Sequence, residues 1–311
     1  MVIPEKVRRK AVSMGDSGRA WLDDLPRQIA ELESRWSISV GQPARRGTEA
    51  YVVEARTSDG LDVILKIVMP GIDPTRQELR MLRAANGTGY ARLLRDDEVD
   101  NVMLIEKLGP QLHEFHFPED RRIRIICATL REAWMPNPTG QAFASGADRA
   151  IELSRTIEQH WSPRDTRCSE RAVELALSYA ERRRRAFDPA RSVLVHGDAH
   201  EWNTLRAPGG LTGFRFIDPD GAVAERAFDL AIPMREWGSV LPAGDLLQLG
   251  RHRCDLLSRS AGVEHQPIWE WSLIQCVSNG LLLHRIGLDD PASVEFAMAD
   301  AWAAAGDWAD P

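Results

Sequence analysis

The sequence predicts an α+β protein with two lobes, an N-terminal lobe with an antiparallel sheet and helices and a larger, mainly helical C-terminal lobe. Three observations lead to this fold class. Residues 40–105 contain apolar runs of strand character that are separated by turns. Residues 111–190 and 246–308 are mostly apolar at helical intervals. Gly109-Pro110 breaks the chain between them, so we predict an N-terminal lobe of residues 1–108 and a C-terminal lobe of residues 109–311.

Length and composition agree with such a fold. The chain has 311 residues, of which 43% are hydrophobic and 27% charged, as in an ordinary globular protein. The net charge of −7 disfavours nucleic-acid binding and favours cationic ligands. The sequence contains neither an apolar run of about 18 residues nor a signal-peptide core, so we expect a cytoplasmic protein without a membrane span. We also expect a monomer or weak dimer.

The cysteines are scattered along the chain, which predicts reduced thiols. They are Cys127, Cys168, Cys254 and Cys276.

At the N-terminus, the sequence predicts a helix for residues 19–36 but none for residues 1–18. Residues 1–18 are polar and basic, and we expect them to be loosely held. Residues 19–36 carry apolar side chains at steps of three and four, which predicts an amphipathic helix. Pro26 is expected to interrupt this helix near its start, because proline lacks the backbone N–H that a helix uses.

Residues 40–69 are predicted to form the first strands of the sheet. Asp59-Gly60 lies between two apolar runs and predicts a tight hairpin turn. Before the second strand, Gly47 and Thr48 offer backbone N–H groups and a hydroxyl that can lie over phosphates. The loop lacks the full GxGxxG pattern, so this prediction depends on the motifs that follow.

Lys66 lies inside an apolar strand, where an unpaired ammonium group is costly, so it requires an anionic partner. Asp73-Pro74 is a typical helix start, and the helix is predicted to run to about Ala85. Glu78 shares the inward face of this helix. The pair resembles the strand lysine and helix glutamate that position nucleotide phosphates. The alternative is a lysine that extends from an edge strand into solvent.

The strand predicted over residues 102–105 leads to Glu106-Lys-Leu108, just before the Gly-Pro break. A strand that joins two lobes can bind adenine through its main chain, and we assign this role to Glu106 and Leu108.

Two apolar runs later in the chain each end in carboxylates. The first continues into His196-Gly-Asp198, with Asn203 five residues after the aspartate, and the second ends in Asp218. This spacing is typical of a phosphoryl-transfer loop, in which one Asp receives the hydroxyl proton while an Asn and a second Asp bind Mg²⁺. Magnesium prefers such hard oxygen ligands.

Three alternatives remain open. The first is a buried strand that ends in an ordinary Asp-rich turn. The second is a metal-dependent hydrolase, because alternating His196, Asp198 and His200 can face one metal ion. The third is a non-catalytic, kinase-like binding module, which would be expected to lack Lys66 or one of the three loop residues.

Several acidic residues after Asp218 are candidates for binding the acceptor. If they converge below the phosphate site, they form an anionic cleft edged by aromatic rings, which suits a cationic substrate. The alternative is that they are surface acids and core tryptophans. The candidates are Asp220, Glu225, Glu236, Trp237 and Glu270, the last of which lies between Trp269 and Trp271.

These motifs resemble the aminoglycoside phosphotransferase family, and more narrowly its branch of streptomycin 6-phosphotransferases and hydroxyurea-resistance kinases. The resemblance is carried by His196-Gly-Asp198-x-His200-x-x-Asn203, Ile217-Asp218-Pro219 and Phe228-Asp229-Leu230-Ala231. It implies a bilobal protein-kinase-like fold and the cofactors ATP and Mg²⁺. It further implies that Asp198 is the catalytic base, that Asn203 and Asp218 bind magnesium, and that His196 and Asp229 hold the catalytic loop.

The resemblance also implies an enzyme that phosphorylates a hydroxyl of a small molecule. Our best prediction for the acceptor is an aminoglycoside such as streptomycin, which would give antibiotic resistance by phosphorylation. The alternative is another small alcohol or a hydroxyurea-like acceptor. Gly197 stands where protein kinases have Arg, and the segment from Asp220 to Arg226 departs from the pattern of streptomycin kinases, which leaves the acceptor open.

Overall fold

A computed structural model gives the structure of the chain. It describes residues 2–44, 49–71, 74–137, 143–162, 167–209, 212–235 and 244–308, apart from the side chains of residues 74–76. The chain divides into two compact units, Met1–Gly109 and Pro110–Pro311. The predicted boundary after Leu108 lies one residue before this division.

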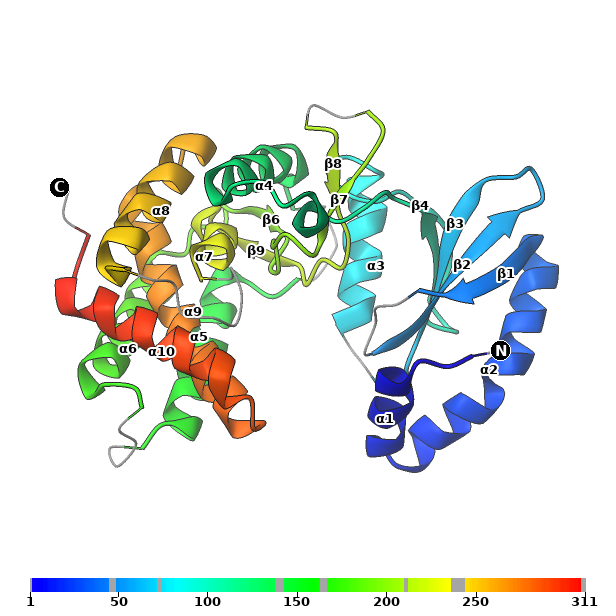
Figure 1. The fold of residues 1–311 in the computed structure, drawn as a ribbon, viewed down its shortest axis with the longest axis horizontal. Helices are drawn as coiled ribbons and strands as arrows, with labels where there is room; N and C mark the ends of the chain where they lie inside the picture. Colours follow the sequence, from blue (N-terminus) through cyan, green and yellow to red (C-terminus); the bar gives the residue numbers. More distant parts are fainter. Residues whose placement is uncertain are drawn as a thin grey trace. The chain divides into compact units, whose positions relative to one another are not determined.

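The N-terminal unit contains a five-stranded sheet in the order β1-β2-β3-β5-β4 (Figure 1). All neighbouring strands are antiparallel. The predicted hairpin turn joins β2 to β3, where Gly60 has a φ of 87° and its N–H donates to the Thr57 carbonyl. The strands are β1 (Ile38–Pro43), β2 (Ala50–Thr57), β3 (Asp62–Val68), β4 (Leu93–Asp97) and β5 (Val102–Glu106).

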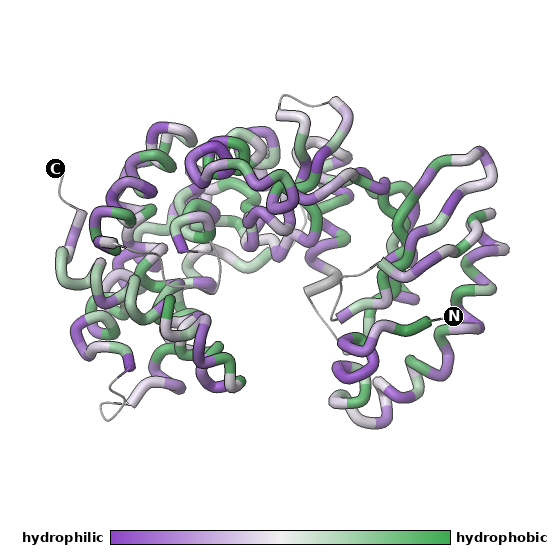
Figure 2. Tube along the Cα trace, in the orientation of Figure 1, coloured by the Kyte–Doolittle hydropathy of each residue, from purple (hydrophilic) through white to green (hydrophobic). Residues whose placement is uncertain are grey.

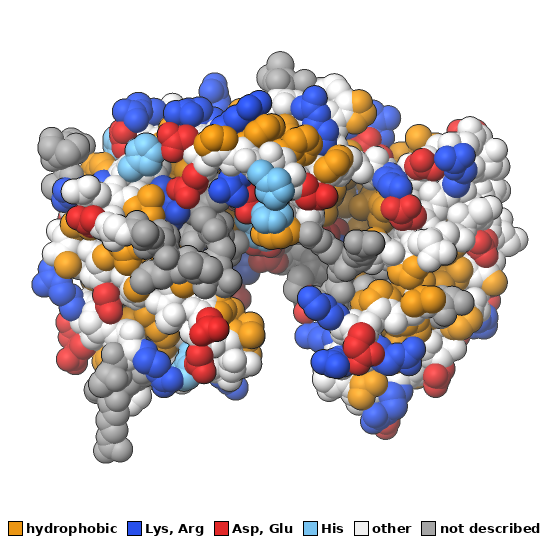
Figure 3. Space-filling view, in the orientation of Figure 1, with side chains coloured by type: hydrophobic (Ala, Val, Ile, Leu, Met, Phe, Trp, Pro, Cys, Tyr) orange, Lys and Arg blue, Asp and Glu red, His pale blue; other side chains and the backbone are white. Residues whose placement is uncertain are grey.

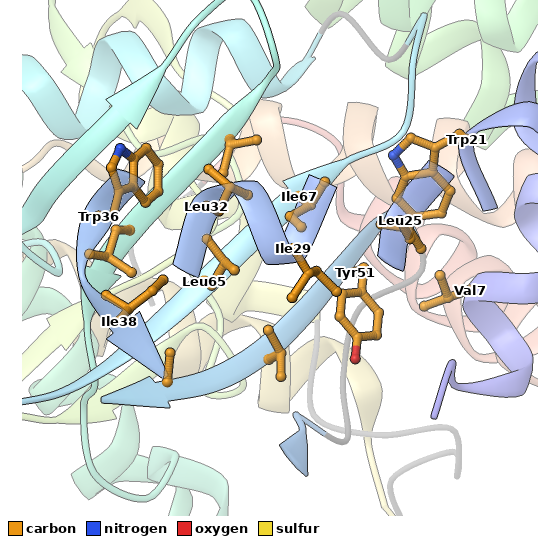
Figure 4. Close-up of a cluster of buried hydrophobic side chains, with 14 of the residues drawn as sticks. Val7, Trp21, Leu25, Ile29, Leu32, Trp36, Ile38, Tyr51, Leu65 and Ile67 are labelled. Carbon is orange, nitrogen blue, oxygen red and sulfur yellow. The ribbon is translucent and has the colours of Figure 1, made fainter. Parts of the chain in front are cut away.

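Two helices, α1 (Glu5–Ser13) and α2 (Asp16–Trp36), cover one face of this sheet. The buried side of α2 packs against alternate residues of β2 and β3, including Leu65 and Ile67 (Figure 4). Hydrophobic and hydrophilic residues alternate along the tube of α2 (Figure 2), as expected for a helix with one buried face.

Two predictions about this region are wrong. Residues 1–18 are not loosely held throughout, because Val7 and Ala11 of α1 are buried in the same core as α2. Pro26 does not interrupt the second helix, since α2 continues through it. Apolar burial on both sides of the proline offsets the hydrogen bond that it removes.

The side chain of Lys66 points to the opposite face of the sheet, because successive strand residues alternate and its neighbours Leu65 and Ile67 point to α2. Helix α3 (Pro74–Ala85) lies on this face and supplies Glu78. The helix ends as predicted at Asn86 and Gly87, whose φ values of 45° and 83° are left-handed.

The C-terminal unit is mainly helical and contains two short antiparallel ribbons, β6 (Val193–Val195) with β9 (Ala222–Ala224) and β7 (Thr204–Arg206) with β8 (Phe214–Phe216). Helix α9 is buried along most of its length and contacts α5, α6, α7 and α10 (Figure 1). The helices are η1 (Leu112–Phe115), α4 (Glu119–Ala133), α5 (Gly146–His160), α6 (Glu170–Ala186), α7 (Ala227–Arg235), α8 (Leu246–Ala261), α9 (His265–Arg285) and α10 (Asp289–Ala305).

The surface carries both charges. Lys and Arg side chains are interspersed with Asp and Glu side chains over the face seen in Figure 3. All four cysteines are free and buried. Among the described helices, none combines the length and apolar character needed to cross a membrane.

Candidate active site

In the N-terminal unit, Lys66 and Glu78 form a close ion pair. The Lys66 Nζ atom donates to both carboxylate oxygens of Glu78, at 2.9 and 2.7 Å. Both side chains are largely buried. Strand β3 lies between β2 and β5, so Lys66 is on a central strand and the edge-strand alternative is wrong.

The other predicted nucleotide contacts of this unit are only partly described. The Glu106 N–H donates to the Arg92 carbonyl at 2.9 Å, and its carboxylate accepts from the Arg92 N–H at 2.8 Å. A contact from Glu106 to adenine would therefore use its carbonyl oxygen. Leu108 follows the end of β5. Gly47 and Thr48 lie outside the described residues.

In the C-terminal unit, the loop that follows β6 is held by the carboxylate of Asp229. This side chain is fully buried and accepts three hydrogen bonds. Its Oδ1 accepts from the Gly197 N–H at 2.7 Å, and its Oδ2 accepts from the His196 N–H at 2.9 Å and from Trp134 Nε1 at 2.8 Å. Burial raises the pKa of Asp229 to about 6, while these three donors oppose the shift. Asp229 lies in the first turn of α7.

His196 is also fully buried, and both of its ring nitrogens are used. Its Nδ1 accepts from the Asp198 N–H at 3.1 Å, so its Nε2 carries the proton and donates to the Ile217 carbonyl at 3.1 Å. Burial lowers the pKa of His196 to about 4, which keeps the ring neutral near pH 7. A ring engaged in this way is not a metal ligand. In the described part of the chain, no group of three His, Cys, Asp or Glu side chains could hold a metal ion. The engagement of both ring nitrogens of His196 argues against the hydrolase alternative, in which this ring would face the metal ion.

The carboxylate of Asp198 is 43% exposed, yet it is fixed from two sides. Its Oδ2 accepts from Asn203 Nδ2 at 3.0 Å and lies 3.3 Å from His200 Nε2. His200 Nδ1 accepts from the Asn203 N–H at 3.2 Å, which leaves the proton on Nε2. Burial raises the pKa of Asp198, but the His200 hydrogen bond and the charge of Arg235 help to lower it to about 2. The carboxylate is therefore ionised and can accept a proton.

Asn203 and Asp218 are brought together by the β7–β8 ribbon. The Ile217 N–H donates to the Asn203 carbonyl at 3.0 Å, which continues the ribbon by one residue pair, and Asp218 follows at once. Asn203 Nδ2 donates to the Asp198 backbone at 3.1 Å as well as to its carboxylate, so Oδ1 is left for another ligand. Asp218 is exposed and has a φ of 52°, an uncommon value that is often found at functional sites. A neutral oxygen and a carboxylate fit a magnesium ion that takes its other ligands from water and phosphate.

Of the predicted acceptor residues, Asp220 lies beside the catalytic loop. Its N–H donates to the His196 carbonyl at 2.8 Å, and its carboxylate is 45% exposed and lies 3.2 Å from Arg149. Glu225 accepts from Trp271 Nε1 at 2.9 Å and lies 3.3 Å from Arg183. It lines a cavity of about 690 Å³. Glu225 follows β9 at the end of the β6–β9 ribbon that is remote from His196.

The structure argues against an acceptor role for Glu270. Its side chain is fully buried, and its carboxylate contacts Arg182 at 2.6 Å, Arg183 at 2.5 Å and Gln266 at 2.7 Å. An acid in a buried ion-pair network has no oxygen directed to a solvent-filled cleft. The flanking Trp269 and Trp271 are core residues, as the alternative interpretation states. Glu236 and Trp237 lie outside the described residues.

The sequence patterns did not indicate several other residues that contact the loop after β6 or its anchor Asp229. Trp134, which holds Asp229, is 95 positions away in the chain. Glu201 is buried and bonded to Arg122 and to His113 Nδ1, the latter at 3.1 Å. Trp202 stacks on the His113 ring with centroids 3.6 Å apart. The local pattern around these residues carries no signal of their partners, because the contacts join distant segments.

The Lys66–Glu78 contact leads to a test of coupling. We expect Lys66→Met and Glu78→Gln each to lower the melting temperature, since each leaves a largely buried group without its partner. The double variant is expected to be less destabilised than the sum of both, with a coupling of about 1 kcal/mol or more. Chemical denaturation of the four proteins measures this coupling. Additive effects within error would contradict a direct interaction.

Comparison with known proteins identifies the family. The family model for aminoglycoside/hydroxyurea antibiotic resistance kinases matches residues 35–287. The chain is 29% identical to a streptomycin 6-kinase of Streptomyces griseus, across 94% of this chain and 93% of that protein. It is 27% identical to a hydroxyurea phosphotransferase of Kitasatospora aureofaciens, across 86% of this chain and 75% of that protein.

Solved structures share the fold. The chain superposes on the choline kinase LicA of Streptococcus pneumoniae with a TM-score of 0.59 at 15% identity, covering 90% of this chain and 99% of LicA. An amicoumacin kinase bound to AMP-PNP, Ca²⁺ and amicoumacin gives a TM-score of 0.60 at 15% identity, covering 86% and 89% of the two chains. The predicted kinase-like α+β fold and the predicted family are thus confirmed. The chain belongs to the aminoglycoside/hydroxyurea antibiotic resistance kinases and is a small-molecule phosphotransferase.

Proposed function

We propose that this phosphotransferase moves the γ-phosphoryl group of ATP to a hydroxyl group of streptomycin or a closely related aminoglycoside. The observation that carries the chemical part is the ionised, half-exposed Asp198 carboxylate, which Asn203 and His200 hold in place. The similarity to a streptomycin 6-kinase over nearly the whole chain supports the acceptor.

In the proposed reaction, the acceptor hydroxyl oxygen bonds to the γ-phosphorus while the bond from this phosphorus to the β–γ bridging oxygen breaks. Asp198 accepts the hydroxyl proton, and ADP leaves with the electron pair of the broken bond. The lowered pKa of Asp198 keeps its carboxylate ionised near neutral pH, so it can accept a hydrogen bond from the hydroxyl group and then its proton. Positioning of the hydroxyl supplies most of the acceleration.

Two further sets of residues take part in the proposal. Lys66 donates to phosphate oxygens, and Glu78 keeps its ammonium group in one position. Asn203 Oδ1 and the Asp218 carboxylate would hold Mg²⁺, which supplies positive charge that neutralises the phosphates. Both groups offer hard oxygen atoms, which this ion prefers. The Asn203 amide is oriented with its Nδ2 toward Asp198, so its Oδ1 can bind the ion.

The acceptor part of the proposal depends on charge. Streptomycin carries guanidinium groups, and Asp220 offers a partly exposed carboxylate next to the catalytic loop. A hydroxyurea-like acceptor is the second candidate, since the family and one relative carry that name. Hydroxyurea is neutral and small, so its binding would not depend on Asp220.

The chemical role of Asp198 is tested by Asp198→Asn. We expect turnover to fall by about 10²–10⁴-fold, the usual scale for a positioned base. Nucleotide affinity should change little, because Asn retains the shape of the side chain. Steady-state ADP release and calorimetric nucleotide binding separate the two effects. Turnover near that of the wild type would exclude Asp198 as the base.

The acceptor is tested by incubating the protein with ATP and either streptomycin or hydroxyurea. Mass spectrometry is expected to detect phosphorylated streptomycin, and its KM should rise with ionic strength because screening weakens the charge contacts. Asp220→Asn should raise this KM, whereas Glu158→Gln removes the same charge from an exposed position of α5 and should not. Phosphorylation of hydroxyurea alone would contradict the acceptor while leaving the kinase chemistry intact.

A further inference from the structure

The segment that carries Asp218 lies between two strands of the C-terminal unit. It connects β8 to β9 and includes two left-handed residues, Asp218 with φ 52° and Gly221 with φ 45°. The N–H groups of Asp220 and Gly221 both donate to the His196 carbonyl, at 2.8 and 3.0 Å. Hydrogen bonds to the carbonyl groups of this turn would give it further support.

Arg149 of α5 supplies that support. Its Nη2 donates to the Asp220 carbonyl at 3.1 Å, to the Asp220 carboxylate at 3.2 Å and, at a longer 3.4 Å, to the Gly221 carbonyl. Its Nη1 donates to Glu152, which is largely exposed. The Arg149 side chain is only 15% exposed, so its own charge is largely shielded from water.

The first residues of α5 are held against β9, which places Arg149 next to the turn. Ser145 forms a bridge with Val223 of β9 and caps the helix through the Asp148 N–H. Gly146 follows, and a Cβ atom there would lie 3.1 Å from the Cβ of Ala224, so the helix approaches β9 closely. Arg149 directly follows Asp148 of the capping box and so lies near the fixed start of α5. From this position its side chain contacts the turn that precedes β9.

The charge of Arg149 also matters for the acids around it. Asp198, Asp218 and Asp220 bring three carboxylates into one short region of the loop and turn. Like charges repel each other, and in the absence of a cation the Asp220 carboxylate would compete with Asp218 for a bound metal. The guanidinium of Arg149 donates to the Asp220 carboxylate and so places a positive charge next to this acid.

We infer that Arg149 is a positioning residue that presents Asp218 to the metal–nucleotide complex. The inference rests on the proposed function, in which Asp218 binds Mg²⁺. It assigns to α5 a part in magnesium binding without any direct contact to the ion. Residues that orient metal ligands typically change metal affinity by about 10- to 100-fold when replaced.

The test compares nucleotide binding with and without magnesium. Calorimetry with a non-hydrolysable ATP analogue, in excess Mg²⁺ and in EDTA, gives the affinity gain due to the metal for each protein. Arg149→Met keeps the apolar stem and is expected to reduce this gain by about tenfold, with metal-free binding unchanged. Arg149→Lys retains one donor and should recover part of it. Glu152→Gln removes only the exposed partner of Arg149 and should match the wild type.

Four results are informative. An unchanged magnesium gain in Arg149→Met would overturn the inference. So would an equal loss of affinity with and without magnesium, which would show a merely structural role. If Arg149→Met does not fold, Arg149→Lys carries the test, and a wild-type magnesium gain in that variant would contradict the inference. A wild-type protein that binds no nucleotide would instead refute the proposed function, and the inference with it.

Discussion

The buried carboxylate of Asp229 is the interaction on which the catalytic loop depends. It accepts hydrogen bonds from the main chain of His196 and Gly197 and from the indole of Trp134. It thereby joins the end of β6 to the start of α7 and the end of α4. The positive end of the α7 dipole favours a negative charge in its first turn. Removing the carboxylate would leave buried N–H groups without acceptors, at about 1–3 kcal/mol each.

The geometry of the loop follows from this anchor. Gly197 has a φ of 86°, and a Cβ at this position would lie 3.2 Å from the Cβ of Asp220. A residue with a side chain would be strained there, so this position favours glycine. With the backbone fixed, His196 supports the Asp198 N–H, and Asn203 and His200 orient the Asp198 carboxylate. The buried carboxylate of Asp229 thus fixes the loop that orients the partly exposed carboxylate of Asp198.

Short-range patterns in the sequence predicted much of the fold and some of the contacts among the candidate site residues. The hairpin at Gly60, helix α3 and the Lys66–Glu78 contact follow from alternation, helix starts and the cost of an unpaired buried ammonium group. The spacing from Asp198 to Asn203 likewise predicted a compact loop. These features depend on residues that are close in sequence, where local rules apply.

The features that could not be predicted depend on distant partners. Glu270 resembles a cleft acid in sequence, but Arg182 and Arg183 from α6 meet it in the core. Nothing near Trp134 or Arg149 indicates that they contact Asp229 and Asp220. Helix α1 was not predicted because only two of its residues are buried, which leaves a weak apolar pattern. The predicted interruption at Pro26 was wrong because burial of the helix outweighed the low helix propensity of proline.

The most direct test of this account is the rate of a single turnover in Asp229→Asn. The amide places N–H groups against N–H donors, so the loop should lose its fixed geometry while the fold survives at low temperature. We expect the single-turnover rate, measured at saturating nucleotide, to fall by at least about 100-fold because the loop no longer positions Asp198. Near-ultraviolet circular dichroism verifies the fold. A folded Asp229→Asn protein that transfers phosphate at the wild-type rate would contradict the account.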